Sequence, residues 1–181
     1  MIPAPKAFRG DPGWLAQTVE SALEPDLPIV DAHHHLWDNQ HGRYLVWELA
    51  ADINSSGHNV EATVYIESYA SMWRASGPAS LRPVGETEFA NGMAAISASA
   101  KYGKARICSG IVCHADLRRG SAVAEELQAH LAAAPERLRG VRAFAQWNDA
   151  IAALSPTGAD EHDRKGLLKD PNFRAGVAQL S

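Results

Sequence analysis

Four short runs of apolar, largely β-branched residues constrain the fold of this chain more than any other feature. The runs cover residues 29–33, 62–67, 105–114 and 138–144, and helical patterns over 84–101 and 121–134 separate the later runs. Parallel strands need long crossover connections, so strands that alternate with helices predict βα units and a parallel sheet. The sequence therefore predicts the α/β class, and the spacing of the runs suits either an open doubly wound sheet or a (β/α)8 barrel.

Two regions follow from this pattern. Residues 1–27 predict a helical lead-in, because Asp11 and Pro12 form a cap signal and apolar residues recur at helical spacing as far as Leu23. Residues 28–181 contain the four βα units. Asp170 and Pro171 repeat the cap signal and predict a last helix from that point.

Composition excludes several classes of function. The chain has 181 residues, 46% hydrophobic and 21% charged, with a formal net charge of −4. No apolar run approaches the ~18 residues of a membrane span, and no secretory signal is visible, so we expect a cytoplasmic protein without a membrane partner. Scattered Lys and Arg give no footprint for nucleic acid. Cys108 and Cys113 predict packing rather than a disulfide.

Three consecutive histidines close the first predicted strand. Side chains alternate along a strand, so His33 and His35 face one side and His34 the other. Two imidazoles on one face can bind a single Zn, Mn or Fe ion, and ligands bind at the carboxyl ends of parallel strands. We therefore predict His33 and His35 as metal ligands and His34 as structural. The alternative is a polar strand end whose histidines cap the turn.

Further polar residues end the other predicted strands. Glu67 could bind substrate or orient a histidine, or it could be a solvated loop residue. His114 could line the site or lie on the surface. Arg142 could hold a substrate anion or form a structural ion pair with a carboxylate. Sequence alone leaves each of these alternatives open.

Other ionisable residues are given ordinary structural roles. Glu86 lies in the first turn of a predicted helix, where the helix dipole accounts for it. His130 is predicted to be solvated on a surface helix. His162 follows the fourth strand and would lie on the catalytic side.

The segment IVDAHHHLWD resembles the first-strand motif of the amidohydrolase-related TIM-barrel hydrolases, a branch that includes sugar-lactone hydrolases and 2-pyrone-4,6-dicarboxylate lactonase. The resemblance continues through GHNVEATVYIE, GIVCHADL and LRGVR. It implies a (β/α)8 TIM barrel, of which residues 28–181 would be the first half, ending after the fourth strand.

The resemblance also implies roles for particular residues. His33 and His35 would bind a divalent metal, Zn or Mn, although some members of this branch are thought to work without one. Glu67, His114 and Arg142 would face the same pocket. The family takes further ligands after later strands, so a complete metal shell is not expected within one copy of this chain.

The implied activity is hydrolysis of a lactone, or a related cyclic ester or amide, of a small carboxylated or sugar-derived substrate. A water molecule activated by the metal or by a general base would attack the carbonyl. One alternative is a decarboxylase of the same superfamily. Another is a truncated, non-catalytic half barrel that self-associates through its exposed edge strands.

Overall fold

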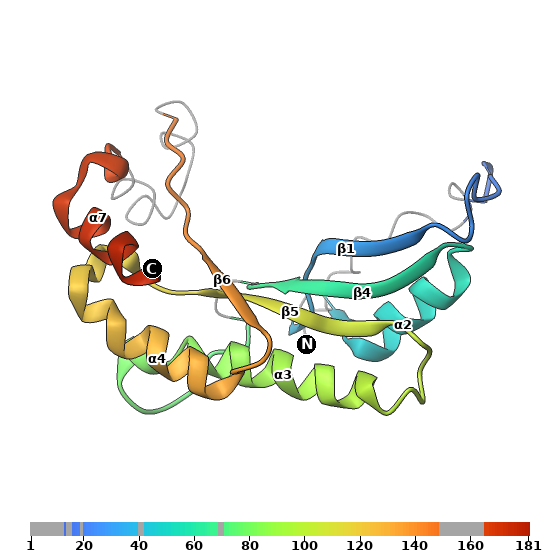
Figure 1. The fold of residues 1–181 in the computed structure, drawn as a ribbon, viewed down its shortest axis with the longest axis horizontal. Coiled ribbons are helices and arrows are strands. Elements are labelled where there is room, and N and C mark those ends of the chain that lie inside the picture. Colours follow the sequence, from blue (N-terminus) through green and yellow to red (C-terminus); the bar gives the residue numbers. More distant parts are fainter. Residues whose placement is uncertain (1–12, 14–15, 19, 40–41, 69–70, 149–164) are drawn as a thin grey trace, which may run out of the picture.

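A four-stranded parallel sheet organises the chain (Figure 1). The computed structural model describes residues 13, 16–18, 20–39, 42–68, 71–148 and 165–181. The strands follow the order β1-β4-β5-β6. Their bounds are Pro28–His34 for β1, Asn59–Ile66 for β4, Arg106–His114 for β5 and Leu138–Arg142 for β6. The predicted α/β class and parallel sheet are confirmed.

The register brings the carboxyl ends of these strands to one edge of the sheet. Ile66 pairs with Val112, and His114 pairs with Arg142. Glu67, directly after β4, donates its backbone N–H to the carbonyl oxygen of Val112 at 2.9 Å. Polar residues that follow different strands are therefore neighbours in space.

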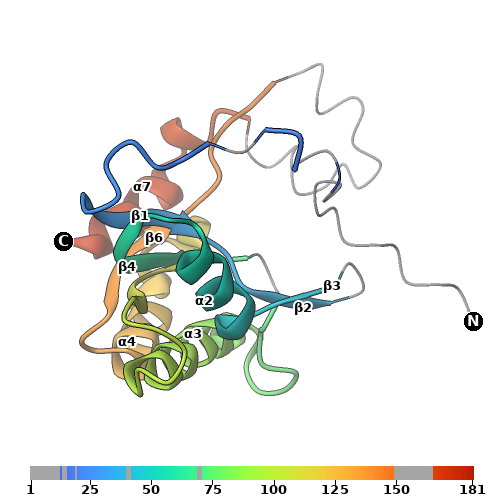
Figure 2. The ribbon, with the colours of Figure 1, turned by 90° about the vertical axis from the view of Figure 1, so that its right-hand side faces the viewer.

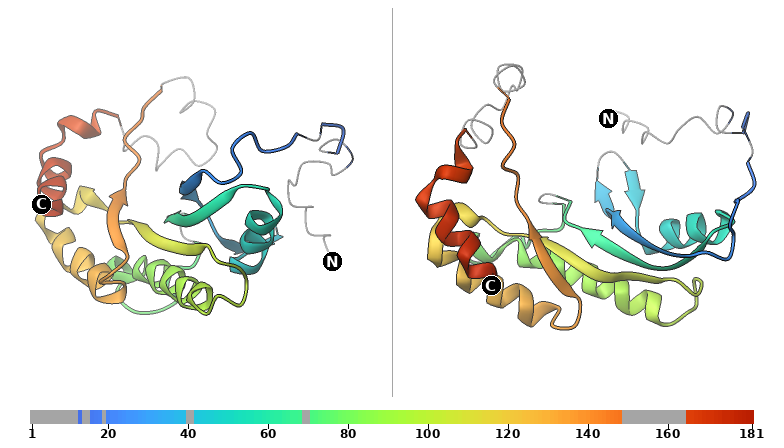
Figure 3. Two further views of the ribbon diagram at one scale, coloured as in Figure 1. Left: turned by 45° about the vertical axis from the view of Figure 1, so that its right-hand side comes forward. Right: turned by 45° about the horizontal axis from the view of Figure 1, so that its top comes forward.

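Three helices cover one face of the sheet: α2 (Val46–Ser55), α3 (Val84–Ala98) and α4 (Ala124–Ala133) (Figures 1 and 3). On the covered face, Tyr65 and Ile111 are buried in a core shared with α2 and α3. On the other face, Val64 and Val112 stay partly exposed. Within the described part of the chain, the sheet thus has one covered face and one open face.

A small hairpin after β1 is a feature that the sequence did not predict. Strands β2 (Trp37–Asn39) and β3 (Gly42–Tyr44) pair antiparallel and project from the sheet (Figure 2). Trp37 stacks on Tyr44 with ring centroids 5.1 Å apart. Such cross-strand aromatic pairs stabilise short hairpins, and this one leads directly into α2.

The last elements lie beyond the carboxyl ends of β5 and β6 (Figure 1). Helix α7 (Pro171–Val177) follows the short 3-10 turn η3 (Leu167–Lys169) and precedes η4 (Ala178–Leu180). The predicted cap is confirmed, because Oδ1 of Asp170 accepts the N–H of Phe173 at 2.9 Å. Phe173 is buried against η2 (Leu117–Val123), so α7 is packed onto the turn that follows β5.

Two predicted helices need correction. Of the lead-in, Gly13 is helical, residues 16–18 and 20–27 are not helical, and 11, 12, 14, 15 and 19 lie outside the described residues. The predicted helix therefore does not reach Leu23, which is 98% exposed and has no surface to pack on. Likewise, α-helical hydrogen bonding begins at Ala124 rather than at Ser121. Residues 121–123 form the 3-10 end of η2 that leads into α4, and Gly120, with φ +60°, separates them from the first part of η2.

No helix in the described ranges is long and apolar enough to cross a lipid bilayer.

Candidate active site

The two histidines predicted as a pair lie together at the end of β1, His33 within the strand and His35 directly after it. Nε2 of His33 is 3.2 Å from Nε2 of His35, and the two rings meet edge to face. Nδ1 of His35 lies 2.9 Å from the carbonyl oxygen of Ile66 at the end of β4. Because a carbonyl oxygen can only accept, this Nδ1 carries a proton, and in the neutral tautomer Nε2 of His35 keeps a lone pair that faces His33.

This geometry fits two ligands of one metal ion. Two Zn–N bonds of about 2.0–2.1 Å at a tetrahedral angle place the ligand nitrogens about 3.3–3.4 Å apart. The observed separation of 3.2 Å is close to that value. Among the described residues, however, no three His, Cys, Asp or Glu side chains gather where they could hold a metal. His33 and His35 therefore supply two ligands where protein zinc sites use three or four.

His34 is buried on the side away from this pair. Its Nε2 lies 2.8 Å from the Thr63 hydroxyl oxygen, which also accepts the backbone N–H of Cys108 at 3.0 Å. Burial lowers the pKa of His34 to about 4, so this imidazole is neutral at physiological pH. The contacts agree with the structural role predicted for His34, which ties the end of β1 to β4 and β5.

Glu67 and Arg142 form an ion pair across the sheet. Nε of Arg142 donates to Oε1 of Glu67 at 2.6 Å, and Nη2 donates to the Glu67 carbonyl oxygen at 2.6 Å. Glu67 is fully buried, while the Arg142 side chain is 25% exposed. The guanidinium also lies over the ring of Phe144, 4.9 Å from its centroid. Of the two roles open for Arg142, the structure shows the ion pair, which leaves part of the cation exposed to solvent.

Glu86 lies in the first turn of α3, as predicted, but it is also a buried carboxylate, which the helix dipole alone did not predict. It accepts a hydrogen bond from the Tyr65 hydroxyl at 2.7 Å and another from the backbone N–H of Ser68. Burial raises the pKa of the Glu86 carboxyl. The spacing of Glu86, Ala90 and Ala94, four residues apart on the buried face of α3, is the signal that could have revealed it.

His114 lines a separate pocket. The pocket has a volume of about 410 Å³ and lies between the end of β5 and the C-terminal helix α7. The His114 ring lies against Trp73 with centroids 5.4 Å apart. Neither Glu67 nor Arg142 lines this pocket. The structure thus joins Glu67 to Arg142, while His114, which ends the intervening strand β5 in register with Arg142, lines this cavity.

His130 is fully buried, so its predicted solvation was wrong. Its Nδ1 lies 2.8 Å from the Thr87 hydroxyl oxygen on α3, and burial lowers its pKa to about 4. Glu126, one turn earlier on α4, is also buried, and sequence reasoning did not single it out. Val123, Leu127 and His130 recur at helical spacing, which is the pattern of a face packed on a neighbouring helix.

Both cysteines are free and buried. Burial raises the pKa of each thiol to about 12, so both stay protonated and serve packing, as predicted. His162 lies outside the described residues.

Comparison of the chain with models of protein families, with curated proteins and with solved structures found no significant match.

Proposed function

We propose that this chain contributes to a hydrolase of the amidohydrolase type, which opens a lactone or a related cyclic ester or amide of a small carboxylated or sugar-derived substrate. The proposal includes a (β/α)8 barrel whose first four βα units are residues 28–181. The observation that carries it is the convergence of His33 and His35, with the Nε2 lone pair of His35 directed at its partner.

Each residue of the strand ends has a role in this reaction. His33 and His35 would hold a divalent cation, Zn²⁺ or Mn²⁺, which when bound supplies an activated water or a polarised carbonyl. Arg142 keeps a partly exposed guanidinium at the same edge of the sheet and can bind a substrate carboxylate or the developing oxyanion. Glu67 fixes that guanidinium in place through Oε1 and its own backbone carbonyl.

Replacing His35 with alanine tests this proposal. We expect H35A to lower the affinity of this chain for Zn²⁺ at least tenfold, and to abolish lactone opening in a complete barrel that contains these residues, because it removes a ligand whose tautomer the Ile66 carbonyl sets. Calorimetric titration with Zn²⁺ measures the first effect. Proton release from a panel of sugar-derived and carboxylated lactones, with Zn²⁺ or Mn²⁺ added, measures the second.

His58 offers a matched control, since it is an exposed histidine in the turn before β4. H58A should bind Zn²⁺ and open lactones as the wild type does. Zn²⁺ affinity that is unchanged in H35A, or a complete barrel containing residues 28–181 that opens no lactone, would refute the proposal. Release of CO2 from an aromatic or muconate-type acid would instead favour the decarboxylase alternative.

A second candidate function is a non-catalytic half barrel that self-associates. It is favoured by the edges of the described sheet, where β1 and β6 each pair on one side only, and by Val30 of β1, which is 61% exposed. An exposed apolar edge strand is a template for pairing with another chain.

Sedimentation velocity across a range of protein concentrations tests this candidate. We expect a concentration-dependent dimer. V30K should raise the dissociation constant of this dimer about tenfold or more, because a lysine on an edge strand opposes pairing. L168K, on another exposed apolar side chain remote from β1, is the matched control and should leave the dimer unchanged. A wild-type monomer at every concentration would exclude self-association.

A further inference from the structure

The pocket beside His114 has the size and walls of a binding site for a small organic molecule. Its volume of about 410 Å³ falls within the usual range for ligand pockets. Much of its wall is apolar and comes from elements far apart in the sequence: Trp73, Phe144, Leu167 and Phe173. The polar lining is concentrated on the side of η2 and α4. A ligand with an apolar body and one polar end matches this distribution.

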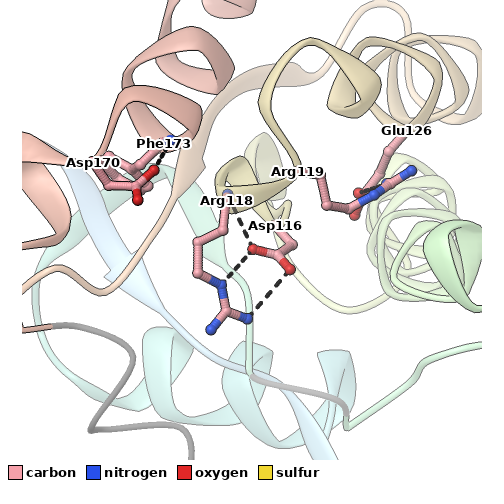
Figure 4. Close-up of polar contacts among 6 residues, drawn as sticks. All are labelled: Asp116, Arg118, Arg119, Glu126, Asp170 and Phe173. Carbon is pink, nitrogen blue, oxygen red and sulfur yellow. Dashed lines mark hydrogen bonds and ion pairs between the residues drawn. The ribbon is translucent and has the colours of Figure 1, made fainter.

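Two arginine–carboxylate pairs form that polar side (Figure 4). Arg118 contacts Asp116 through Nε at 2.7 Å and Nη2 at 3.2 Å, and both side chains are more than a third exposed. Arg119 is more enclosed and uses only Nη1, which donates to Oε2 of Glu126 at 2.8 Å. Among the described residues, no group accepts from Nε or Nη2 of Arg119. This guanidinium therefore retains donors for a ligand.

The partner of Arg119 is the buried carboxyl group of Glu126, one oxygen of which receives no hydrogen bond from the described residues. Glu126 is 1% exposed, lines the pocket, and its Oε1 has no hydrogen-bond partner within the part of the chain described. Nε2 of His130 lies 4.0 Å from Oε1, beyond hydrogen-bond distance, and burial keeps His130 neutral by lowering its pKa to about 4. Burial raises the pKa of Glu126 to about 7, against the opposing effect of Arg119.

The charges around Glu126 decide what the pocket prefers at each pH. Arg119 faces it from η2, Asp116 from the cap of η2 and His130 from its own helix, while His114 lines the same pocket. When Glu126 is ionised, its charge balances Arg119. When Glu126 takes up a proton, the charge of Arg119 is no longer balanced, and an anion can replace the carboxylate as its partner.

We infer that this pocket binds a small organic carboxylate with an apolar body, held by Arg119, and that binding is coupled to uptake of one proton by Glu126. The apolar body would lie among Trp73, Phe144 and Phe173. The inference concerns binding and not turnover, so it stands or falls separately from the proposed hydrolase.

Calorimetric titration with benzoate, and with benzamide as its neutral isostere, tests the inference. We expect benzoate to bind at least tenfold more tightly than benzamide at pH 5.5, because only benzoate pairs with the guanidinium. Benzoate affinity should fall about 30-fold between pH 5.5 and pH 8.5, since the ionised form of Glu126 excludes the anion above its pKa. Titrations in buffers of different ionisation enthalpy should show about half a proton taken up per benzoate at pH 7.0.

Two variants assign the effect to its residues. E126Q fixes a neutral side chain at this position, so benzoate should bind it with an affinity that does not vary with pH and without proton uptake. R119Q should lose at least tenfold in benzoate affinity at pH 5.5. R139Q is the matched control, because Arg139 is an exposed arginine on β6 that donates only to the backbone carbonyls of Leu138 and Glu136. Its benzoate affinity should be unchanged.

Several results would overturn the inference. Equal affinity for benzoate and benzamide would show that the pocket does not select an anion. An R119Q variant that binds benzoate normally would show that the Arg119 guanidinium does not hold the ligand. A histidine can also take up a proton in this pH range, so pH dependence that persists in E126Q would assign the proton to a group other than Glu126. If E126Q does not fold, two measurements on the wild type still test the inference: the affinity for benzoate relative to benzamide, and the number of protons taken up per benzoate.

Discussion

Replacing Gly176 with alanine is expected to detach helix α7 from the turn that follows β5. A Cβ atom at this position would lie 2.1 Å from the carbonyl oxygen of Leu117 and 2.9 Å from its carbonyl carbon. Both neighbours are backbone atoms, so relief requires the helix to move as a whole. Overpacking of this kind costs about 1–3 kcal/mol and sometimes more, and the loss of Phe173 burial adds to it. We expect a loss of about 3 kcal/mol in the free energy of unfolding.

Urea unfolding measures this loss, and amide hydrogen exchange across residues 165–181 shows whether it begins at α7. Gly92 is the matched control, because it is exposed in the middle of α3 and an added Cβ would meet nothing within 4 Å. G92A should stabilise the protein by about 0.5–1 kcal/mol through improved helix propensity. A G176A variant as stable as the wild type would show that α7 is not packed on Leu117 in this way.

Removing Arg142 is the second change with a large expected effect. R142M leaves the buried carboxylate of Glu67 without the guanidinium that donates to it at 2.6 Å. Breaking a buried pair costs about 3–5 kcal/mol, and the partial exposure of Arg142 favours the lower end, about 3 kcal/mol. The loss should appear in urea unfolding at pH 7.

A double-mutant cycle separates the pair from other effects. Since E67Q removes the buried charge, the E67Q/R142M variant should be more stable than R142M alone. R43M is the control, because Arg43 forms an exposed pair with Glu48 and should contribute less than about 1 kcal/mol. Strictly additive losses in E67Q and R142M would mean that the pair has no coupling energy and that Glu67 is stabilised by other groups.

The strands were predictable because each is a short run of apolar, largely β-branched residues, and helical patterns separate the later runs. The pairing of His33 with His35 followed from alternation along β1, and the structure brings their Nε2 atoms together. The hairpin formed by β2 and β3 was not predictable from such runs, since three-residue strands carry too few residues to show a period.

Burial of ionisable side chains was the least predictable part of the candidate site. Glu86 and His130 are polar residues on helices, and the sequence offers an ordinary solvated role for each. Their burial depends on which face of α3 and α4 meets the sheet and the neighbouring helix. That choice comes from the whole pattern of apolar neighbours, such as Ala90 and Leu127, rather than from the polar residue itself.

The contact between His35 and the carbonyl of Ile66 has a consequence for how the sequence of this site can vary. Every amino acid offers the same main-chain carbonyl, so a change of side chain at position 66 leaves the acceptor for His35 in place. A one-residue insertion or deletion in β4 would remove it by shifting the strand. The orientation of the imidazole is therefore insensitive to a substitution of its partner Ile66, but it is sensitive to an insertion or deletion in β4.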